Sequence, residues 1–233
     1  MTAAGSRRTG VLVRRLRDDR GDRVVLLSHC LLNENTRYLG GAGRAGCVRE
    51  IVDACADAGL GMVQMPCPEE AAWGGVLKRR LLLAYGSSRW LPHRLRALVL
   101  RAALAYTRLV YRRLARDAAR RVADYRTSGV DVVAIVGVDG SPSCGVATRL
   151  DMGRALDGLC DADPRSITIG DMKTIVRGAV TPGAGLYTEA VKDQLRRRGI
   201  DVAYLAHDLL AELDGKPAAV AASLTAPPPG PAG

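Results

Sequence analysis

Short apolar runs alternate with segments of helical periodicity through most of the chain. Each run is rich in β-branched residues and nearly free of polar ones, which is typical of strands buried on both faces. Apolar residues recur at helical spacing over 48–58 and 186–198, and a glycine follows each segment. A further short strand is expected at 167–169. The apolar runs predict four strands, at 23–28, 60–65, 130–138 and 200–205.

This alternation predicts a parallel sheet, because parallel neighbours are joined by crossovers that are usually helical. The predicted class is α/β with three layers. A mainly parallel sheet of four to five strands carries helices on both faces, and a long basic amphipathic helix is inserted between strands two and three.

The domain organisation follows from where the alternation begins and ends. We expect a single α/β domain at 21–212, which includes a basic helical insertion at about 76–127. Residues 1–20 are polar and basic without periodicity, and residues 213–233 end in a proline-rich run. Both ends are therefore expected to be disordered.

Composition bounds the compartment and the role of the cysteines. The 233-residue chain has no uncharged apolar run of about eighteen residues, and its first 20 residues lack the apolar core of a signal peptide. We expect a cytoplasmic protein, with a peripheral membrane location left open. Structural disulfides are rare in reducing cytosol, so the six cysteines are expected to be ligands, nucleophiles or buried apolar residues.

Three of the cysteines follow three predicted strands. Cys30 comes after the first strand, Cys67 after the second and Cys144 after the third, each flanked by proline, glycine or polar residues. In open parallel sheets the ligand crevice lies just beyond the carboxyl ends of the strands. We therefore expect the three thiols to meet at one edge of the sheet, although their separations match no local zinc or ferredoxin motif.

The other three cysteines lie in different settings. Cys55 has helical spacing beside apolar residues and is predicted to lie in the core. Cys160 is predicted to lie in an acidic loop, where a thiolate is disfavoured. Cys47 opens the first predicted helix, where the N-terminal field lowers a thiol pKa, and its role stays open.

Three convergent thiolates indicate a soft metal centre. They suit zinc, copper(I) or an iron–sulfur cluster, and three protein ligands leave one metal position open for substrate chemistry. Polar residues beside the cysteines are candidates for proton transfer and substrate contact, and His29 is a candidate to tune a cluster by hydrogen bonding. The polar candidates are Glu69, Glu70, Ser141, Ser143, Asn33, Asn35 and Arg37.

Three segments carry these cysteines in order along the chain. They are His29-Cys30-Leu31-Leu32-Asn33 with Asn35, Thr36 and Arg37, then Pro66-Cys67-Pro68-Glu69, then Gly137-Val138-Asp139-Gly140-Ser141-Pro142-Ser143-Cys144-Gly145-Val146. Together they resemble the motifs of the 2-thiouracil desulfidase family, more closely those of a branch of related desulfidases. The similarity runs in register from about residue 23 to 207.

The resemblance implies an iron–sulfur enzyme. In that family three cysteines hold a [4Fe-4S] cluster whose fourth iron has no protein ligand and takes the thiocarbonyl sulfur of the substrate. Carried over, Cys30, Cys67 and Cys144 would be the cluster ligands. Glu69 would donate and accept protons while water replaces sulfur, and Ser141 would be the second catalytic residue. The implied activity removes sulfide from a thiolated small molecule, a thiouracil-like thiocarbonyl compound.

Two segments depart from the characterised members of that family. Those members have a glycine-containing first motif that ends Arg-Tyr-Asp-Gly, and a Lys-Ser-Arg lead into the third. Here asparagines line the first loop, and Val138-Asp139-Gly140 leads the third. The ligands are intact, and the changes affect the substrate contacts. The candidates for those contacts are Asn33, Asn35, Arg37 and Ser143.

The segment at 78–121 carries much of the positive charge. It holds thirteen Lys or Arg and one acid, so its net charge of +12 exceeds the +10 of the whole chain. Pro92 is predicted to open a helix that runs to about Asp124. Arginines lie near one face of that helix. Another face gathers Leu95, Leu98, Ala102, Ala105 and Leu109.

Three interpretations of the basic segment stay open. It is a solvated crossover helix, or a docking site for an anionic membrane surface, supported by Trp90, Tyr106 and Tyr111, or an RNA-binding surface. Three function hypotheses result. They are an iron–sulfur desulfidase, a zinc-thiolate enzyme or zinc-stabilised fold on the same cysteines, and a non-catalytic module docked on a membrane or on RNA.

Overall fold

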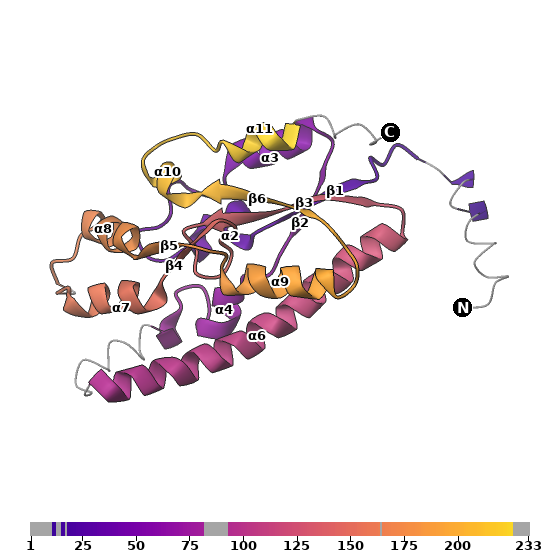
Figure 1. The fold of residues 1–233 in the computed structure, drawn as a ribbon. Helices are drawn as coiled ribbons and strands as arrows, with labels where there is room; N and C mark the ends of the chain where they lie inside the picture. Colours follow the sequence, from indigo (N-terminus) through magenta and orange to yellow (C-terminus); the bar gives the residue numbers. More distant parts are fainter. Residues whose placement is uncertain (1–10, 13–14, 17, 82–92, 164, 226–233) are drawn as a thin grey trace.

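A four-stranded parallel sheet forms the centre of the protein (Figure 1). In sheet order the strands are β2 (Gly61–Gln64), β1 (Arg23–Leu27), β3 (Asp131–Asp139) and β6 (Ala203–Asp208), and all three neighbouring pairs are parallel. The computed structural model describes residues 11–12, 15–16, 18–81, 93–163 and 165–225. The predicted α/β class with a parallel sheet is confirmed.

Helices cover both faces of this sheet (Figure 1). One layer contains α4 (Pro68–Trp73), the long α6 (His93–Thr127) and α9 (Leu186–Arg196). The opposite layer contains α3 (Arg49–Asp57) and α11 (Val220–Thr225). The helices predicted at 48–58 and 186–198 are therefore confirmed as α3 and α9, and α6 joins β2 to β3 as expected.

Strand β1 is buried on both faces, which explains its uninterrupted apolar sequence. Val24 and Leu26 point to the layer of α6 and α9, where they pack with Ala115 and Val191. Their neighbours Val25 and Leu27 point to the opposite layer, which also contains the buried side chain of Cys55, as the sequence predicted.

A small antiparallel ribbon stands apart from the main sheet. It pairs β4 (Thr148–Leu150) with β5 (Val180–Pro182), and α7 (Met152–Asp161) and α8 (Ile169–Ala179) lie between these two strands in the chain. The sequence prediction here is wrong twice. Residues 167–169 form no strand, because Thr168 caps α8 and makes a capping box with Asp171. Cys160 lies in α7 and not in a loop.

The expectation of disorder after residue 212 is also wrong for the residues that the structure describes. The short α10 (Leu209–Leu213) follows β6, and α11 then packs against α3. Val220 and Leu224 occupy one side of α11 and are buried there. Two apolar residues are a weak signal in a sequence, but α3 supplies the surface that buries them. Residues 226–233 lie outside the described residues.

Helix α6 is about 50 Å long, from 35 residues at about 1.5 Å each. Tyr111, Ala115 and Val122 lie on its buried side and pack against the body of the protein. Within the described part of the chain, no helix combines the length and the apolar composition that crossing a bilayer requires. Pro92, predicted to open the helix, lies outside the described residues.

Candidate functional site

Three loops that carry cysteines meet at the carboxyl edge of the sheet. Cys30 lies in the short α2 (His29–Leu32) after β1, Cys67 precedes α4 after β2, and Cys144 lies in the loop after β3. Because β2, β1 and β3 are parallel neighbours, their carboxyl ends lie side by side. Burial raises the pKa of Cys144 most, and the charges of Cys30, Glu69 and Cys67 raise it further.

Burial raises the pKa of all three thiols. For Cys67, burial and the charge of Glu69 raise the pKa to about 12. For Cys30, burial outweighs the opposing effect of the Arg37 guanidinium. With raised pKa values the three groups are neutral thiols at neutral pH, and only a cationic centre among them would convert them to thiolates.

Cys67 owes its position to the start of α4. Its Sγ accepts a hydrogen bond of 3.4 Å from the backbone N–H of Glu70, so the sulfur caps the helix. Pro68 occupies the first helical position, where its missing N–H leaves no hydrogen bond unmade. The sequence Cys-Pro-Glu therefore ends a strand, starts a helix and presents a sulfur at the sheet edge.

The loop of Cys144 is held from inside by Asp139. One carboxylate oxygen, Oδ1, accepts hydrogen bonds from the backbone N–H groups of Val146, Ala147 and Thr148, at 2.8, 2.9 and 3.2 Å. Asp139 therefore anchors the loop that carries Cys144.

Two glycines let the backbone of this loop pack closely. A Cβ on Gly137 would lie 2.3 Å from the carbonyl oxygen of Cys144, and one on Gly145 would lie 2.0 Å from the carbonyl oxygen of Thr148. The loop also docks on the start of α9, where the backbone N–H of Tyr187 donates to the carbonyl oxygen of Ser143 at 3.1 Å. Any larger residue at either glycine would displace the cysteine loop.

The carboxylate of Glu69 joins the Cys67 loop to the Cys144 loop. Its Oε1 accepts a hydrogen bond of 2.7 Å from the Ser143 hydroxyl and a longer one of 3.3 Å from the Ser141 hydroxyl. The two serine hydroxyls are 3.1 Å apart, and the Ser143 hydroxyl also lies 3.7 Å from the sulfur of Cys144. The structure thus brings Glu69, Ser141 and Ser143 together beside two of the thiols.

Lys78 completes this group, although in the sequence it stands out only as part of the basic segment at 78–121. Its Nζ lies 3.4 Å from Glu69 Oε2 and donates a hydrogen bond of 2.7 Å to the carbonyl oxygen of Thr36. The residue is only 6% exposed. Its backbone φ of 52° lies in the left-handed region, which is unfavourable for residues other than glycine. No spacing in the sequence signals a buried lysine here.

Arg37, a candidate for substrate contact, is paired with buried carboxylates. Its Nη1 lies 3.2 Å from Glu34 and 2.9 Å from Glu212. Its Nε and Nη2 are buried and have no hydrogen-bond partner among the described residues. Burial raises the pKa of Cys30, and the charge of Arg37 opposes that effect.

The carboxylate partners of Arg37 tie the first loop to the end of β6. His207 Nε2 and Glu212 Oε2 are 2.5 Å apart, and both residues are buried. Burial would raise the pKa of Glu212, but hydrogen bonding to His207 and the charge of Arg37 lower it to about 2. Burial raises the pKa of Glu34. This ionic network fixes the loop that follows Cys30.

Among the described residues, the remaining candidates make no hydrogen bond to Glu69. Asn33 Oδ1 accepts hydrogen bonds from the backbone N–H and the side-chain amide of Asn35, at 3.2 and 2.8 Å, so it caps the short η1 (Glu34–Thr36). The expected role of the His29 ring in tuning a cluster stays a prediction. Cys47 is half-buried just before α3.

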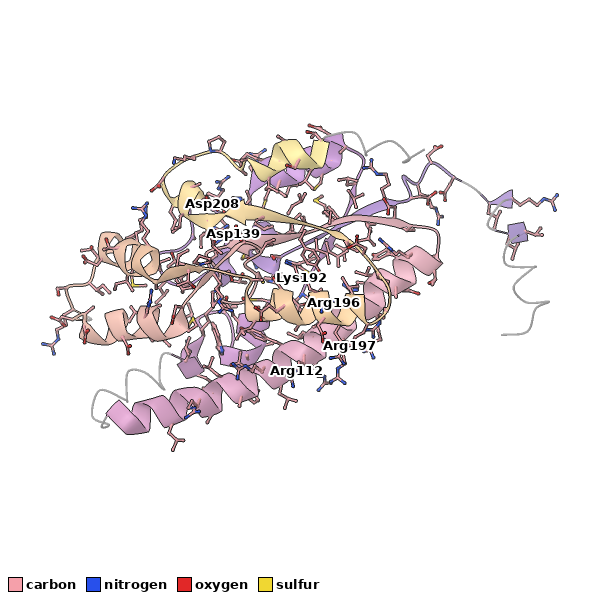
Figure 2. All side chains as sticks on the ribbon, in the orientation of Figure 1. Arg112, Asp139, Lys192, Arg196, Arg197 and Asp208 are labelled. Atoms are coloured by element: carbon pink, nitrogen blue, oxygen red, sulfur yellow. The ribbon has the colours of Figure 1, made fainter. Side chains whose placement is uncertain are left out.

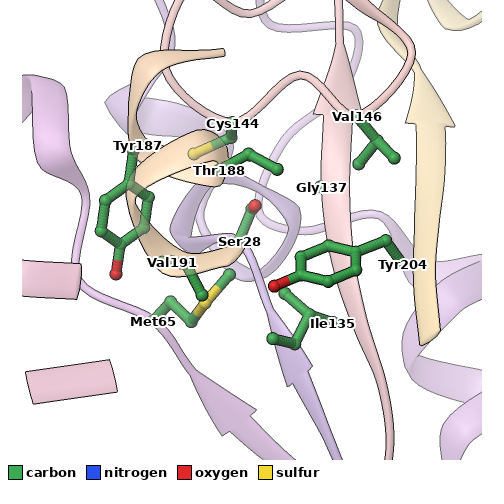
Figure 3. Close-up of a pocket in the computed structure, with 10 residues that line it drawn as sticks. All are labelled: Ser28, Met65, Ile135, Gly137, Cys144, Val146, Tyr187, Thr188, Val191 and Tyr204. Carbon is green, nitrogen blue, oxygen red and sulfur yellow. The ribbon is translucent and has the colours of Figure 1, made fainter. Parts of the chain in front are cut away.

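Two hollows lie near the thiols. A groove of about 490 Å³ beside α6 is lined by His29 and Pro66, the residues before Cys30 and Cys67. A cavity of about 10 Å³ is lined by Cys144, Ser28 and Tyr204 (Figure 3). The hydroxyls of Ser28 and Tyr204 have no hydrogen-bond partner among the described residues. That volume is close to the minimum for one water molecule.

Among the residues with described side chains, no three or more His, Cys, Asp or Glu side chains are arranged to hold a single metal ion.

Comparison with known proteins adds no relative. No family model, no curated protein and no solved structure matches the chain.

Proposed function

We propose that the chain is a desulfidase that uses an iron–sulfur cluster to remove sulfide from a thiolated small molecule, in line with its resemblance to the 2-thiouracil desulfidase family. One observation carries the proposal. Three thiols from distant loops gather at one sheet edge, and a carboxylate hydrogen-bonded to two serines lies beside them.

The residues fit a [4Fe-4S] cluster by the chemistry of their donors. Cys30, Cys67 and Cys144 supply three soft sulfur ligands, which leaves one iron without a protein ligand. Burial raises the pKa of each thiol, so cluster binding would release protons from groups that otherwise stay protonated. When bound, the cluster would supply a Lewis-acidic iron that takes the sulfur of a thiocarbonyl substrate.

The side chains of the site then handle protons and position water. Glu69 is the residue that takes a proton from the attacking water and returns one to the substrate, because its carboxylate lies beside the thiols within reach of two hydroxyls. Ser141 and Ser143 orient that carboxylate through their hydrogen bonds. Lys78 lies 3.4 Å from the other carboxylate oxygen and helps to hold the side chain in place.

The test is anaerobic purification followed by iron and sulfide analysis. We expect brown protein with about four iron atoms per chain, and turnover that releases sulfide from thiouracil-like compounds. Cys30→Ser, Cys67→Ser and Cys144→Ser should each lose most of the iron. Cys55→Ala is the matched control, since that thiol is buried in the opposite layer and should leave the iron content unchanged.

Two results would contradict the proposal. Colourless protein with one zinc per chain would support the zinc-thiolate alternative. If the protein contains no iron and the three serine variants leave it unaffected, the cluster hypothesis is excluded and the non-catalytic module remains.

A further inference from the structure

The outward side of α6 exposes large apolar side chains. Leu98 and Leu109 are 63% and 64% exposed, and Tyr106 is 48% exposed. Ala102 and Ala105, between the two leucines, are exposed as well. At 3.6 residues per turn, Leu98, Ala102, Ala105 and Leu109 follow one another along a single stripe of the helix. This is the apolar face that the sequence analysis identified, and it points to solvent.

The buried side of α6 lies on the other side of the helix. Thr107 accepts a hydrogen bond of 3.0 Å from the indole N–H of Trp73, and Tyr111 packs against Trp73 and Tyr187. Tyr111 is therefore part of the core and cannot support docking, whereas Tyr106 can. The protein already has a complete packing surface for α6, so the leucine stripe is not needed to hold this helix in place.

Positive charge borders the stripe. Arg101, Arg108 and Arg112 are exposed along one side of it and Arg113 along the other, and no acid occurs between Arg101 and Arg116. The neighbouring α9 packs against α6 and carries the exposed residues Arg196 and Arg197 at its end, which Figure 2 labels together with Arg112. Two acids of α6 and α9 have partners. Asp117 pairs with Arg120, and Asp193 lies 2.9 Å from Arg197.

We propose that the outward side of α6 docks on an anionic lipid bilayer, with the helix axis in the plane of the membrane and the leucine stripe among the lipid headgroups. Exposed leucines flanked by arginines are the pattern of an interfacial helix. The leucines gain by leaving water, and the arginines meet lipid phosphates and carboxylates. Nucleic acid would bind the arginines equally well, but its phosphates would gain nothing from the exposed leucines between them.

Vesicle sedimentation tests this docking, using the full chain and phosphatidylcholine vesicles with and without phosphatidylserine. We expect binding only when phosphatidylserine is present, and a decrease as salt rises. Arg101→Glu/Arg108→Glu should weaken binding about 30-fold or more. Leu98→Gln/Leu109→Gln leaves the charge unchanged and should weaken binding about tenfold. All four residues are exposed, so circular dichroism should show an intact fold.

The matched control reverses two charges elsewhere. Arg49→Glu/Lys216→Glu changes the net charge as much as the arginine pair does, at exposed residues of α3 and of the turn before α11. It should bind vesicles within about threefold of the parent chain. Equal loss in this control would show that binding depends on net charge alone and would overturn the proposal.

A parallel titration with tRNA separates the two acidic partners. The membrane proposal fails if two results occur together: tRNA binds more tightly than the vesicles, and the leucine variant binds tRNA and vesicles as well as the parent chain does. The surface would then be a nucleic-acid site. None of these readouts depends on metal content or turnover, so they stand apart from the test of the desulfidase.

Discussion

The hydroxyl of Ser143 donates a hydrogen bond of 2.7 Å to Glu69 Oε1, although 74 positions separate the two residues in the chain. The bond joins the loop after β2 to the loop after β3, and β1 lies between these strands in the sheet. It can form only when all three strands are in register. The group that would move protons is therefore assembled by the same sheet that gathers the thiols.

Glu69 should be required for turnover but not for the cluster. Glu69→Gln keeps the size of the side chain and removes its ability to exchange a proton, so we expect turnover to fall about 100-fold or more at unchanged iron content. Glu70→Gln is the matched control, because its carboxylate makes no contact with the serines. Equal losses in the two variants, measured by sulfide release, would argue against a proton-transfer role for Glu69.

The two serines should differ in what they support. Ser141 Oγ accepts hydrogen bonds from the backbone N–H groups of Ser143 and Cys144, at 3.3 and 3.1 Å. Ser141→Ala leaves these donors unpaired and should lower the free energy of unfolding by about 1–3 kcal/mol. Ser143→Ala removes the shortest hydrogen bond to Glu69, and we expect turnover to fall about tenfold. Urea unfolding with kinetics on both variants checks this, and the reverse pattern would contradict it.

The side chain of Lys78 should stabilise the site, whereas its positive φ should lower the free energy of unfolding. Lys78→Met removes the contacts with Glu69 and the Thr36 carbonyl and keeps the positive φ, so we expect about 1–3 kcal/mol less stability. Lys78→Gly loses the same contacts but relieves the backbone, and should be more stable than the Met variant by about 1 kcal/mol. Urea midpoints that rank the variants the other way would show that the strain is absent.

Glu212 should make the protein acid-sensitive. Its pKa is about 2 when folded, below the ordinary 4.5, so its stabilising effect is complete above pH 4.5 and is lost as the pH falls toward 2. The pH dependence from Glu34 runs the other way, because burial raises its pKa. Its contribution to the free energy of unfolding is present below pH 4.5 and is lost as the pH rises above that value. Glu212→Gln should flatten the acid side of the stability curve, measured by urea unfolding at a series of pH values.

The matched control for this pH dependence is Glu189→Gln. That carboxylate is about half exposed and pairs with Arg149 at the surface, where solvent screens the interaction. Its variant should follow the curve of the parent chain. A parallel loss of slope in both variants would indicate a general effect of removing negative charge.

The sequence by itself determined the sheet and the position of the three thiols. β1 and β3 are buried on both faces, so they must be continuous apolar runs, and a parallel sheet places the loops after its strands at one edge. Cys30, Cys67 and Cys144 each lie in such a loop. Glu69 and Ser141 were within reach of prediction because they lie two and three positions from a cysteine.

Only the tertiary structure decided the partners that come from elsewhere in the chain. Lys78 is the buried residue of a turn whose neighbouring residues are exposed, and it reaches Glu69. Glu212 meets Arg37, which lies 175 positions earlier in the chain. The leucine stripe of α6 resembles a core face in sequence, because periodicity locates an apolar face without saying what covers it. Long-range contacts decide that, and no local pattern encodes them.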